Sequence, residues 1–164
     1  MDFIRNTKGF TLIEFIIVIT ITLIIATVGF VKWISKPFFT VASGAELLAD
    51  DIRYAQSFSM SRGQHYQIIF KSPSSNTYRI LDASDNPITL SSGLLYNTLP
   101  AGVVFSSISI PNGSSEIVFD GLGKPYSDAD TTLPFTTIAS IAIASGTISK
   151  TITVDPETGR VSIQ

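Results

Sequence analysis

The chain begins with one long block of apolar residues and continues with short apolar runs separated by turn-forming residues. Residues 15–31 carry no charge, and only three threonines and Gly29 interrupt their apolar character. With residues 10–14 and 32–34 they make a segment of 25 residues, about 37 Å long as an α-helix. That length exceeds the roughly 30 Å hydrocarbon core of a bilayer, where an isolated segment satisfies its backbone only as a helix. We therefore predict a transmembrane helix over residues 10–36.

Two other structures fit this segment less well. A buried core helix needs a soluble domain that covers it on all faces, which a chain of 164 residues cannot supply. A secretory signal peptide has a shorter apolar region followed by a cleavage site of small residues, whereas residues 28–33 read VGFVKW. The flanking basic residues favour a cytoplasmic N-terminus only slightly; they are Arg5 and Lys8 before the segment and Lys32 and Lys36 after it.

One carboxylate, that of Glu14, lies inside the apolar segment. A charged side chain within a membrane costs a few kcal/mol, and less near the headgroups. Because Glu14 follows Lys8 by only six residues, its carboxylate could reach the headgroups by snorkelling. The functional alternative is an ion pair, for which the free α-amino group of a neighbouring copy would serve. Both interpretations stay open on physical grounds alone.

The residues around Glu14 resemble a known processing signal. Residues 8–14 read KGFTLIE and precede about twenty apolar residues, a pattern similar to the class III signal of type IV pilins and type II secretion pseudopilins. The resemblance implies that a prepilin peptidase cleaves between Gly9 and Phe10 on the cytoplasmic side and then methylates the new N-terminus at Phe10. The leader is then residues 1–9, which leaves 155 of the 164 residues in the mature chain.

The same resemblance implies a role for Glu14 in assembly. In pilin-like filaments the apolar helices pack into a central bundle, and the acid is thought to meet the N-terminal amine of an adjacent subunit. An unpaired carboxylate is unfavourable in a low dielectric, and pairing with the ammonium of Phe10 relieves that cost. The implied partners are the prepilin peptidase, other pilin or pseudopilin subunits and an inner-membrane assembly platform.

The position of the first proline differs from that in many pilins and marks the end of the apolar segment. Many pilins carry a proline well inside the apolar helix, whereas the first proline here is Pro37, and Gly29 would soften the helix instead. We expect a kink or a helix restart at Pro37. Residues 37–63 then form an amphipathic continuation of the N-terminal helix.

A helical stripe supports that continuation. Leu48, Ile52, Ala55 and Phe58 follow one another at intervals of four, three and three residues, which places them on one face of a helix. Gly63 supplies a C-terminal signal. We expect the stripe to pack against a sheet rather than to form a groove for a partner helix.

The remaining residues, 64–164, predict six or seven antiparallel strands. The runs HYQIIF and TYRIL flank a turn-rich loop, GVVFSSISI and SEIVFD flank the hairpin signal PNGS, and FTTIASIAIAS precedes a last hairpin of TITV and RVSI around DPETG. No alternation of strands with helices indicates a parallel sheet. The predicted fold class is α+β, with a long N-terminal helix packed on an antiparallel sheet domain.

Three of these later stretches resemble the type II secretion minor pseudopilin GspH and FimT minor pilin group. The stretches are AQSFSMSRGQHYQIIF at the end of the helix, IVFDGLGKP in mid-domain, and ITVDPETGRVSI at the C-terminus. Their order and spacing agree with the N-terminal signal, so the resemblance touches most of the chain. It implies a minor structural subunit of a type II secretion pseudopilus or, alternatively, a FimT-like minor pilin of a type IV pilus.

Candidate chemistry in residues 64–164 is sparse. The chain has no cysteine, which excludes disulfides and thiolate metal sites, and its one histidine, His65, lies in a predicted strand. The aspartates at 82, 85, 120, 128 and 130 lack the spacing of a calcium loop, so we interpret them as solvated turn residues, with calcium binding as the minor alternative. No phosphate loop or nucleophile elbow occurs. We expect no enzyme activity, no cofactor and no metal.

Nucleic-acid binding has one candidate residue. Some FimT-like minor pilins bind DNA through a C-terminal Gly-Arg-x-Arg pattern; Gly159 and Arg160 match it, but Ser162 replaces the second arginine. Residues 38–164 hold seven basic and eleven acidic side chains, a net charge of −4, which gives little attraction for phosphates. We interpret Gly159 as a turn residue and Arg160 as a solvated strand residue.

These expectations combine into one picture of the chain. It is a single-pass protein of the bacterial inner membrane, with its N-terminus in the cytoplasm and a β-rich domain in the periplasm. After cleavage it enters a pilus or pseudopilus.

Overall fold

The computed structural model describes residues 11–33, 36–72, 74–90 and 92–164, with the backbone alone at 27–33 and 36–37. The chain divides into two units, Met1–Lys36 and Pro37–Gln164.

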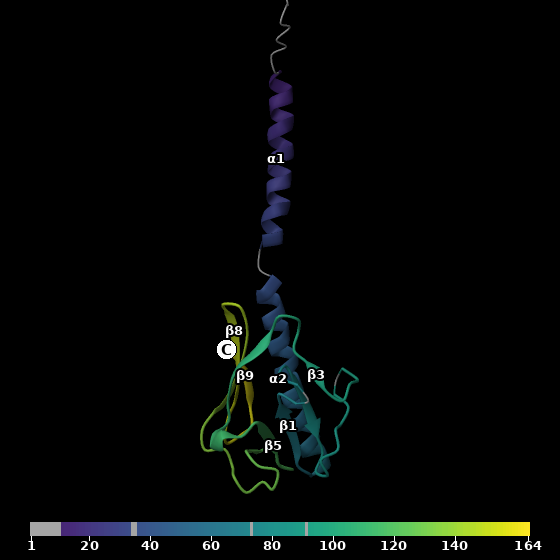
Figure 1. The fold of residues 1–164 in the computed structure, drawn as a ribbon, viewed down its shortest axis with the longest axis vertical. Coiled ribbons are helices and arrows are strands. Elements are labelled where there is room, and N and C mark those ends of the chain that lie inside the picture. Colours follow the sequence, from purple (N-terminus) through teal and green to yellow (C-terminus); the bar gives the residue numbers. More distant parts are fainter. Residues whose placement is uncertain (1–10, 34–35, 73, 91) are drawn as a thin grey trace, which may run out of the picture. The chain divides into compact units, whose positions relative to one another are not determined.

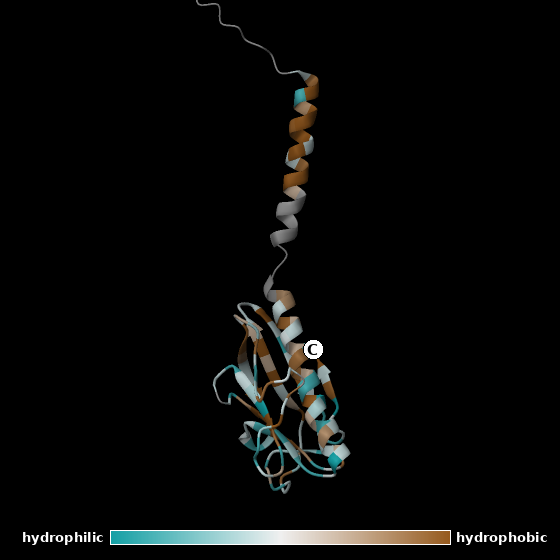
Figure 2. Ribbon diagram, turned by 90° about the vertical axis from the view of Figure 1, so that its right-hand side faces the viewer, coloured by the Kyte–Doolittle hydropathy of each residue, from teal (hydrophilic) through white to brown (hydrophobic). Residues whose placement is uncertain are grey.

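The first unit contains helix α1 (Leu12–Trp33), whose coloured part in Figure 2 is mostly hydrophobic, interrupted by Glu14 and the threonines. The hydroxyl oxygen of Thr11 accepts a hydrogen bond from the backbone N–H of Glu14 at 3.3 Å, which caps the start of the helix. The hydroxyls of Thr20 and Thr22 donate to the carbonyls of Ile16 and Val18, one turn earlier. The threonines therefore satisfy their polar groups within the helix and leave its surface apolar.

The predicted transmembrane segment, residues 10–36, overlaps this helix but lies partly outside the described residues. Within the described part of the chain, no helix combines the length and the apolar character that a membrane crossing requires.

The second unit is built around helix α2 (Lys36–Arg62), which agrees with the helix predicted over residues 37–63 to within one residue at each end. Pro37 lies in its first turn, where a proline costs no hydrogen bond. Leu48, Ile52 and Ala55 of the predicted stripe are fully buried, and Phe58 is half-buried against the core. Gly63 follows the helix at φ +63°, the left-handed conformation that ends many helices.

Two antiparallel sheets pack with α2 (Figure 1). The first sheet has the order β3-β2-β1-β5-β6, with β1 (Tyr66–Phe70), β2 (Thr77–Leu81), β3 (Asn97–Thr98), β5 (Glu116–Phe119) and β6 (Pro125–Tyr126). The second has the order β4-β7-β8-β9, with β4 (Val104–Ser109), β7 (Ala139–Ser145), β8 (Ile148–Val154) and β9 (Val161–Ile163).

The inner faces of both sheets and α2 share one hydrophobic core. Burial alternates along β7, where Ala139, Ile141 and Ile143 are buried, as the period of a strand with one covered face requires. The buried cluster includes Ile68, Ile80, Ile117 and Phe119 from the first sheet and Ile141, Ile143, Ile152 and Val154 from the second. The α+β prediction, with the N-terminal helix packed on antiparallel sheets, is confirmed.

One predicted hairpin is wrong. The turn signal at Pro111–Gly113 suggested that the strands on either side pair with each other, but the segment is a short 3₁₀ turn between the two sheets. Strand β4 pairs with β7, and β5 pairs with β1. The Asn-Gly signal specifies a local reversal, whereas burial of each strand's apolar face against α2 decides its partner. The hairpins β1–β2 and β8–β9 are as predicted.

Candidate functional site

Glu14, the residue predicted to guide assembly, lies in the first turn of α1. Together with Thr11 it forms the T-x-x-E arrangement of a helix start, in which a carboxylate also favours the positive end of the helix dipole. Its side chain is exposed, and no basic side chain of the described residues lies within ion-pair distance of it. Gly9 and Phe10, the predicted cleavage residues, lie outside the described residues.

Of the aspartates interpreted as turn residues, Asp82, Asp120 and Asp128 accept backbone hydrogen bonds within their turns. One carboxylate oxygen of Asp120 accepts backbone hydrogen bonds from Leu122 and Lys124, both at 2.9 Å. Asp155 does the same for Glu157 and Thr158, and its hydrogen bonds with the Thr158 hydroxyl and backbone hold its carboxyl pKa below the ordinary value. Across the described ranges, no three acidic or histidine side chains are grouped so as to hold a metal ion.

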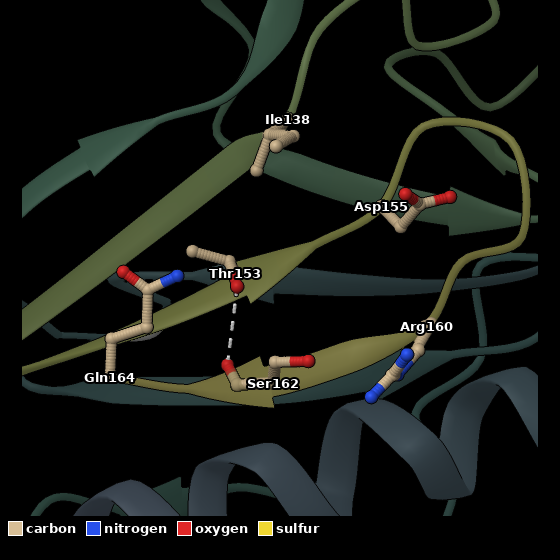
Figure 3. Close-up of a pocket in the computed structure, with 6 residues that line it drawn as sticks. All are labelled: Ile138, Thr153, Asp155, Arg160, Ser162 and Gln164. Carbon is tan, nitrogen blue, oxygen red and sulfur yellow. Dashed lines mark hydrogen bonds between the residues drawn. The ribbon is translucent and has the colours of Figure 1, made fainter.

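Arg160, the candidate DNA contact, is solvent-exposed as expected, but it lies immediately before β9 rather than in the strand. It borders a shallow hollow of about 240 Å³ on the outer face of the second sheet (Figure 3). The same hollow is lined by the carboxylate of Asp155 and by Ile138, Thr153, Ser162 and Gln164. Among the described residues that line the hollow, Arg160 is the only basic one, and the carboxylate of Asp155 offsets its charge. The hollow therefore offers no second cation for a phosphate group in place of the arginine that Ser162 replaces.

Gln56 is a residue that sequence reasoning missed, and it contacts two of the stretches that resemble the GspH and FimT group. Its side-chain amide donates to the carbonyls of Gly123 and Thr158, both at 2.9 Å. It thereby joins the FDGLGKP loop and the DPETGR turn to α2. At Gly159, φ is +67° and a Cβ would lie 2.5 Å from both the Gln56 amide nitrogen and the Gly123 carbonyl oxygen. Only glycine fits that position.

A buried polar network at Asp51 was also missed. Asp51 lies on the buried face of α2, fully inaccessible, and its carboxylate accepts hydrogen bonds from the Tyr78 hydroxyl at 2.7 Å and the Asn97 amide at 2.6 Å. Burial and the negative charge of Asp51 raise the pKa of Tyr78. The signal was present in the sequence, because Asp51 is three residues after Leu48 and four before Ala55, within the buried stripe.

Comparison with protein families decides the class. Residues 4–30 match the prokaryotic N-terminal methylation motif, and residues 44–159 match the model of the type II transport protein GspH. The chain belongs to the GspH family. GspH proteins are minor pseudopilins of type II secretion, structural subunits without enzymatic activity, and the prepilin motif of this chain implies processing by prepilin peptidase and anchoring in the inner membrane.

Solved structures share the GspH fold at low sequence identity. The minor pseudopilin EpsH of the Vibrio cholerae type 2 secretion system superimposes with a TM-score of 0.54 at 11% identity, covering 76% of this chain and 95% of EpsH. The type IV minor pilin FimU of Pseudomonas aeruginosa gives 0.53 at 16% identity, covering 76% and 87%. A search of curated proteins found no match. These likenesses show the pilin-like fold, and the family match places the chain in type II secretion.

Proposed function

We propose that this GspH protein is made as a precursor in the inner membrane and cut between Gly9 and Phe10, with methylation of Phe10. In this proposal residues 1–9 are the leader, 10–36 cross the membrane, 37–63 continue the helix and 64–164 form the periplasmic domain. The N-terminus is cytoplasmic. An assembly platform then moves the mature subunit into the pseudopilus, where Glu14 docks it.

The observation that carries this proposal is the position of Glu14 within the methylation motif. Its side chain is exposed in the first turn of an apolar helix, and the Thr11 hydroxyl caps that turn. Glu14 lies four positions after Phe10, a rise of about 6 Å if the helix of the assembled subunit begins at Phe10. A neighbouring subunit displaced by about that distance places its own N-terminal ammonium at the level of Glu14. The ion pair then sets the axial register between neighbours.

The type IV alternative, a FimT-like minor pilin that takes up DNA, has weaker support. The likeness to FimU concerns the fold, which type II and type IV subunits share. A DNA-uptake role would rest on Arg160 alone, in a unit with a net charge of −4.

The test compares Glu14→Gln with Glu46→Gln in cells that contain the peptidase and the secretion machinery. Glu46 is an exposed carboxylate on α2 and serves as the matched control. Both variants should be processed normally, because neither changes the cleavage residues. Incorporation of Glu14→Gln into sheared pseudopili should fall at least about tenfold, since the ammonium of its neighbour loses its charged partner. Normal incorporation of Glu14→Gln would refute the docking role.

A further inference from the structure

Residues 86–115 contain no charged side chain, a run of thirty residues within the globular unit. The surface of a soluble domain is typically about a quarter to a third charged. This run includes strands β3 and β4, the loop before β3 and the turn after β4. A scarcity of charged residues is typical of the core of a protein interface.

Large apolar side chains of this run face solvent. The exposed fractions are 57% for Leu94, 52% for Leu95, 45% for Tyr96 and 45% for Val104. The first three are consecutive and project from the loop that precedes β3. Three half-exposed side chains of this size present on the order of 300 Å² of apolar surface.

Hydrogen bonds connect the described residues of the loop that presents them to one another and to the core. The Ser92 hydroxyl donates to the side-chain oxygen of Asn97 at 2.5 Å, and the Asn97 amide donates to the buried Asp51 carboxylate. Within the loop, the backbone N–H of Leu90 donates to the Leu94 carbonyl at 2.8 Å. A preorganised loop loses little conformational entropy when a partner covers it.

The charge-free run occupies one edge of each sheet and crosses α2 between them. Strand β3 is the first strand of one sheet order and β4 of the other. The connection between them passes over α2 at Gly44, where a Cβ would lie 3.1 Å from the Cδ atom of Pro100; Figure 1 shows this teal-to-green stretch. Gly44 is eight residues from the start of α2, about 12 Å along the helix. The surface therefore lies beside the half of α2 that follows the apolar segment.

We propose that this charge-free flank, formed by residues 92–109, docks a sibling pilin-like subunit whose own N-terminal helix packs beside this one. The inference rests on the proposed function. Its apolar area is well below the roughly 800 Å² per partner of a stable independent complex. A contact of that size holds only between proteins already tethered side by side, as two subunits anchored in one membrane and one helical bundle are.

The test is site-specific photocrosslinking of the full chain in cells that assemble the pseudopilus. p-Benzoylphenylalanine replaces Leu95 or Tyr96 in turn, and replaces Leu122 as the control. Leu122 is 87% exposed but lies in the Asp120–Lys124 loop, outside the flank. We expect a product from positions 95 and 96 that mass spectrometry identifies as a processed sibling subunit with its own methylation motif, with at least fivefold less product from position 122.

A double variant tests the apolar contact without disturbing the fold, because both side chains are more than half exposed. Leu94→Ser with Leu95→Ser should reduce the crosslink from position 96 at least fivefold, and Leu122→Ser should leave it unchanged. The N-terminus of the same samples is sequenced, and incorporation is measured. A processed and incorporated subunit that gives no crosslink, or crosslinks only to a second copy, a secreted protein or lipid, overturns this inference alone. A subunit that keeps Met1 overturns the proposed function and the inference with it.

Discussion

The carboxylate of Asp51 on α2 accepts a hydrogen bond from the hydroxyl of Tyr78 on β2, 2.7 Å away, in the interior of the globular unit. The same carboxylate binds the amide of Asn97 next to the exposed loop. Asp51 thus connects α2 both to β2 and to the edge strand β3, next to the surface that we propose for docking.

Removing this carboxylate should destabilise the protein strongly. Asp51→Ala leaves the Tyr78 hydroxyl and the Asn97 amide without that acceptor, and we expect a loss of about 2–4 kcal/mol in the free energy of unfolding. Asp50→Ala is the matched control, because Asp50 is exposed and pairs with Arg53 on the helix surface at 2.7 Å. It should cost at most about 0.5 kcal/mol. Urea unfolding of the full chain in detergent measures both, and equal losses would argue against the network.

The packing of Gly159 against α2 predicts a position-specific cost for alanine. Gly146 and Gly159 both have positive φ, +62° and +67°, but nothing lies within 4 Å of a Cβ at Gly146. Gly146→Ala should cost about 1–2 kcal/mol, the strain of the left-handed conformation alone. Gly159→Ala should cost at least about 3 kcal/mol, because the new methyl group also displaces the Gln56 amide. Thermal unfolding of the two variants measures the difference. Similar melting temperatures would contradict the close packing of Gly159 against the Gln56 amide.

The raised pKa of Glu116 predicts that removing its negative charge stabilises the protein at neutral pH but not at acid pH. Partial burial raises the pKa of its carboxyl, and the charges of Asp85 and Asp128 raise it further. The folded state therefore favours the protonated carboxyl of Glu116. The stability that this preference contributes is fully present below the ordinary pKa of about 4.3, and it is lost as the pH rises through the higher pKa of the folded state. Glu116→Gln should raise the melting temperature by only about 1–2 °C at pH 7, because the side chain is partly exposed and solvent screens its charge. The two proteins should melt together at about pH 3.5; a constant difference across that range would exclude this cause.

Arg160 should not confer DNA binding. With a net charge of −4 on residues 38–164, we expect no retardation of double-stranded DNA by the full chain at physiological salt, and no change on Arg160→Ser. Ser162→Arg restores the Gly-Arg-x-Arg pattern and provides the comparison. Retardation by the wild-type chain that Arg160→Ser abolishes would favour the DNA-uptake alternative.

Local sequence patterns predicted most of the helices and strands. The short strands and the role of Gln56 depend on contacts between residues far apart in the sequence, which local patterns do not reveal. The stripe from Leu48 to Phe58 predicted the buried face of α2, because a helix repeats within a few residues. Strands β3 and β6, of two residues each, were missed because a strand that short is defined by its partner rather than by its own pattern. The role of Gln56 was hidden for the same reason, since its acceptors at Gly123 and Thr158 are 67 and 102 residues away.

The most direct test of the account is the intact mass and N-terminal sequence of the full chain, expressed with and without a prepilin peptidase. The account predicts that the peptidase produces a chain of 155 residues that begins at methylated Phe10, while the chain without peptidase keeps Met1. Persistence of Met1 in the presence of an active peptidase would contradict it, because Glu14 would then lack the N-terminal ammonium of a neighbouring Phe10.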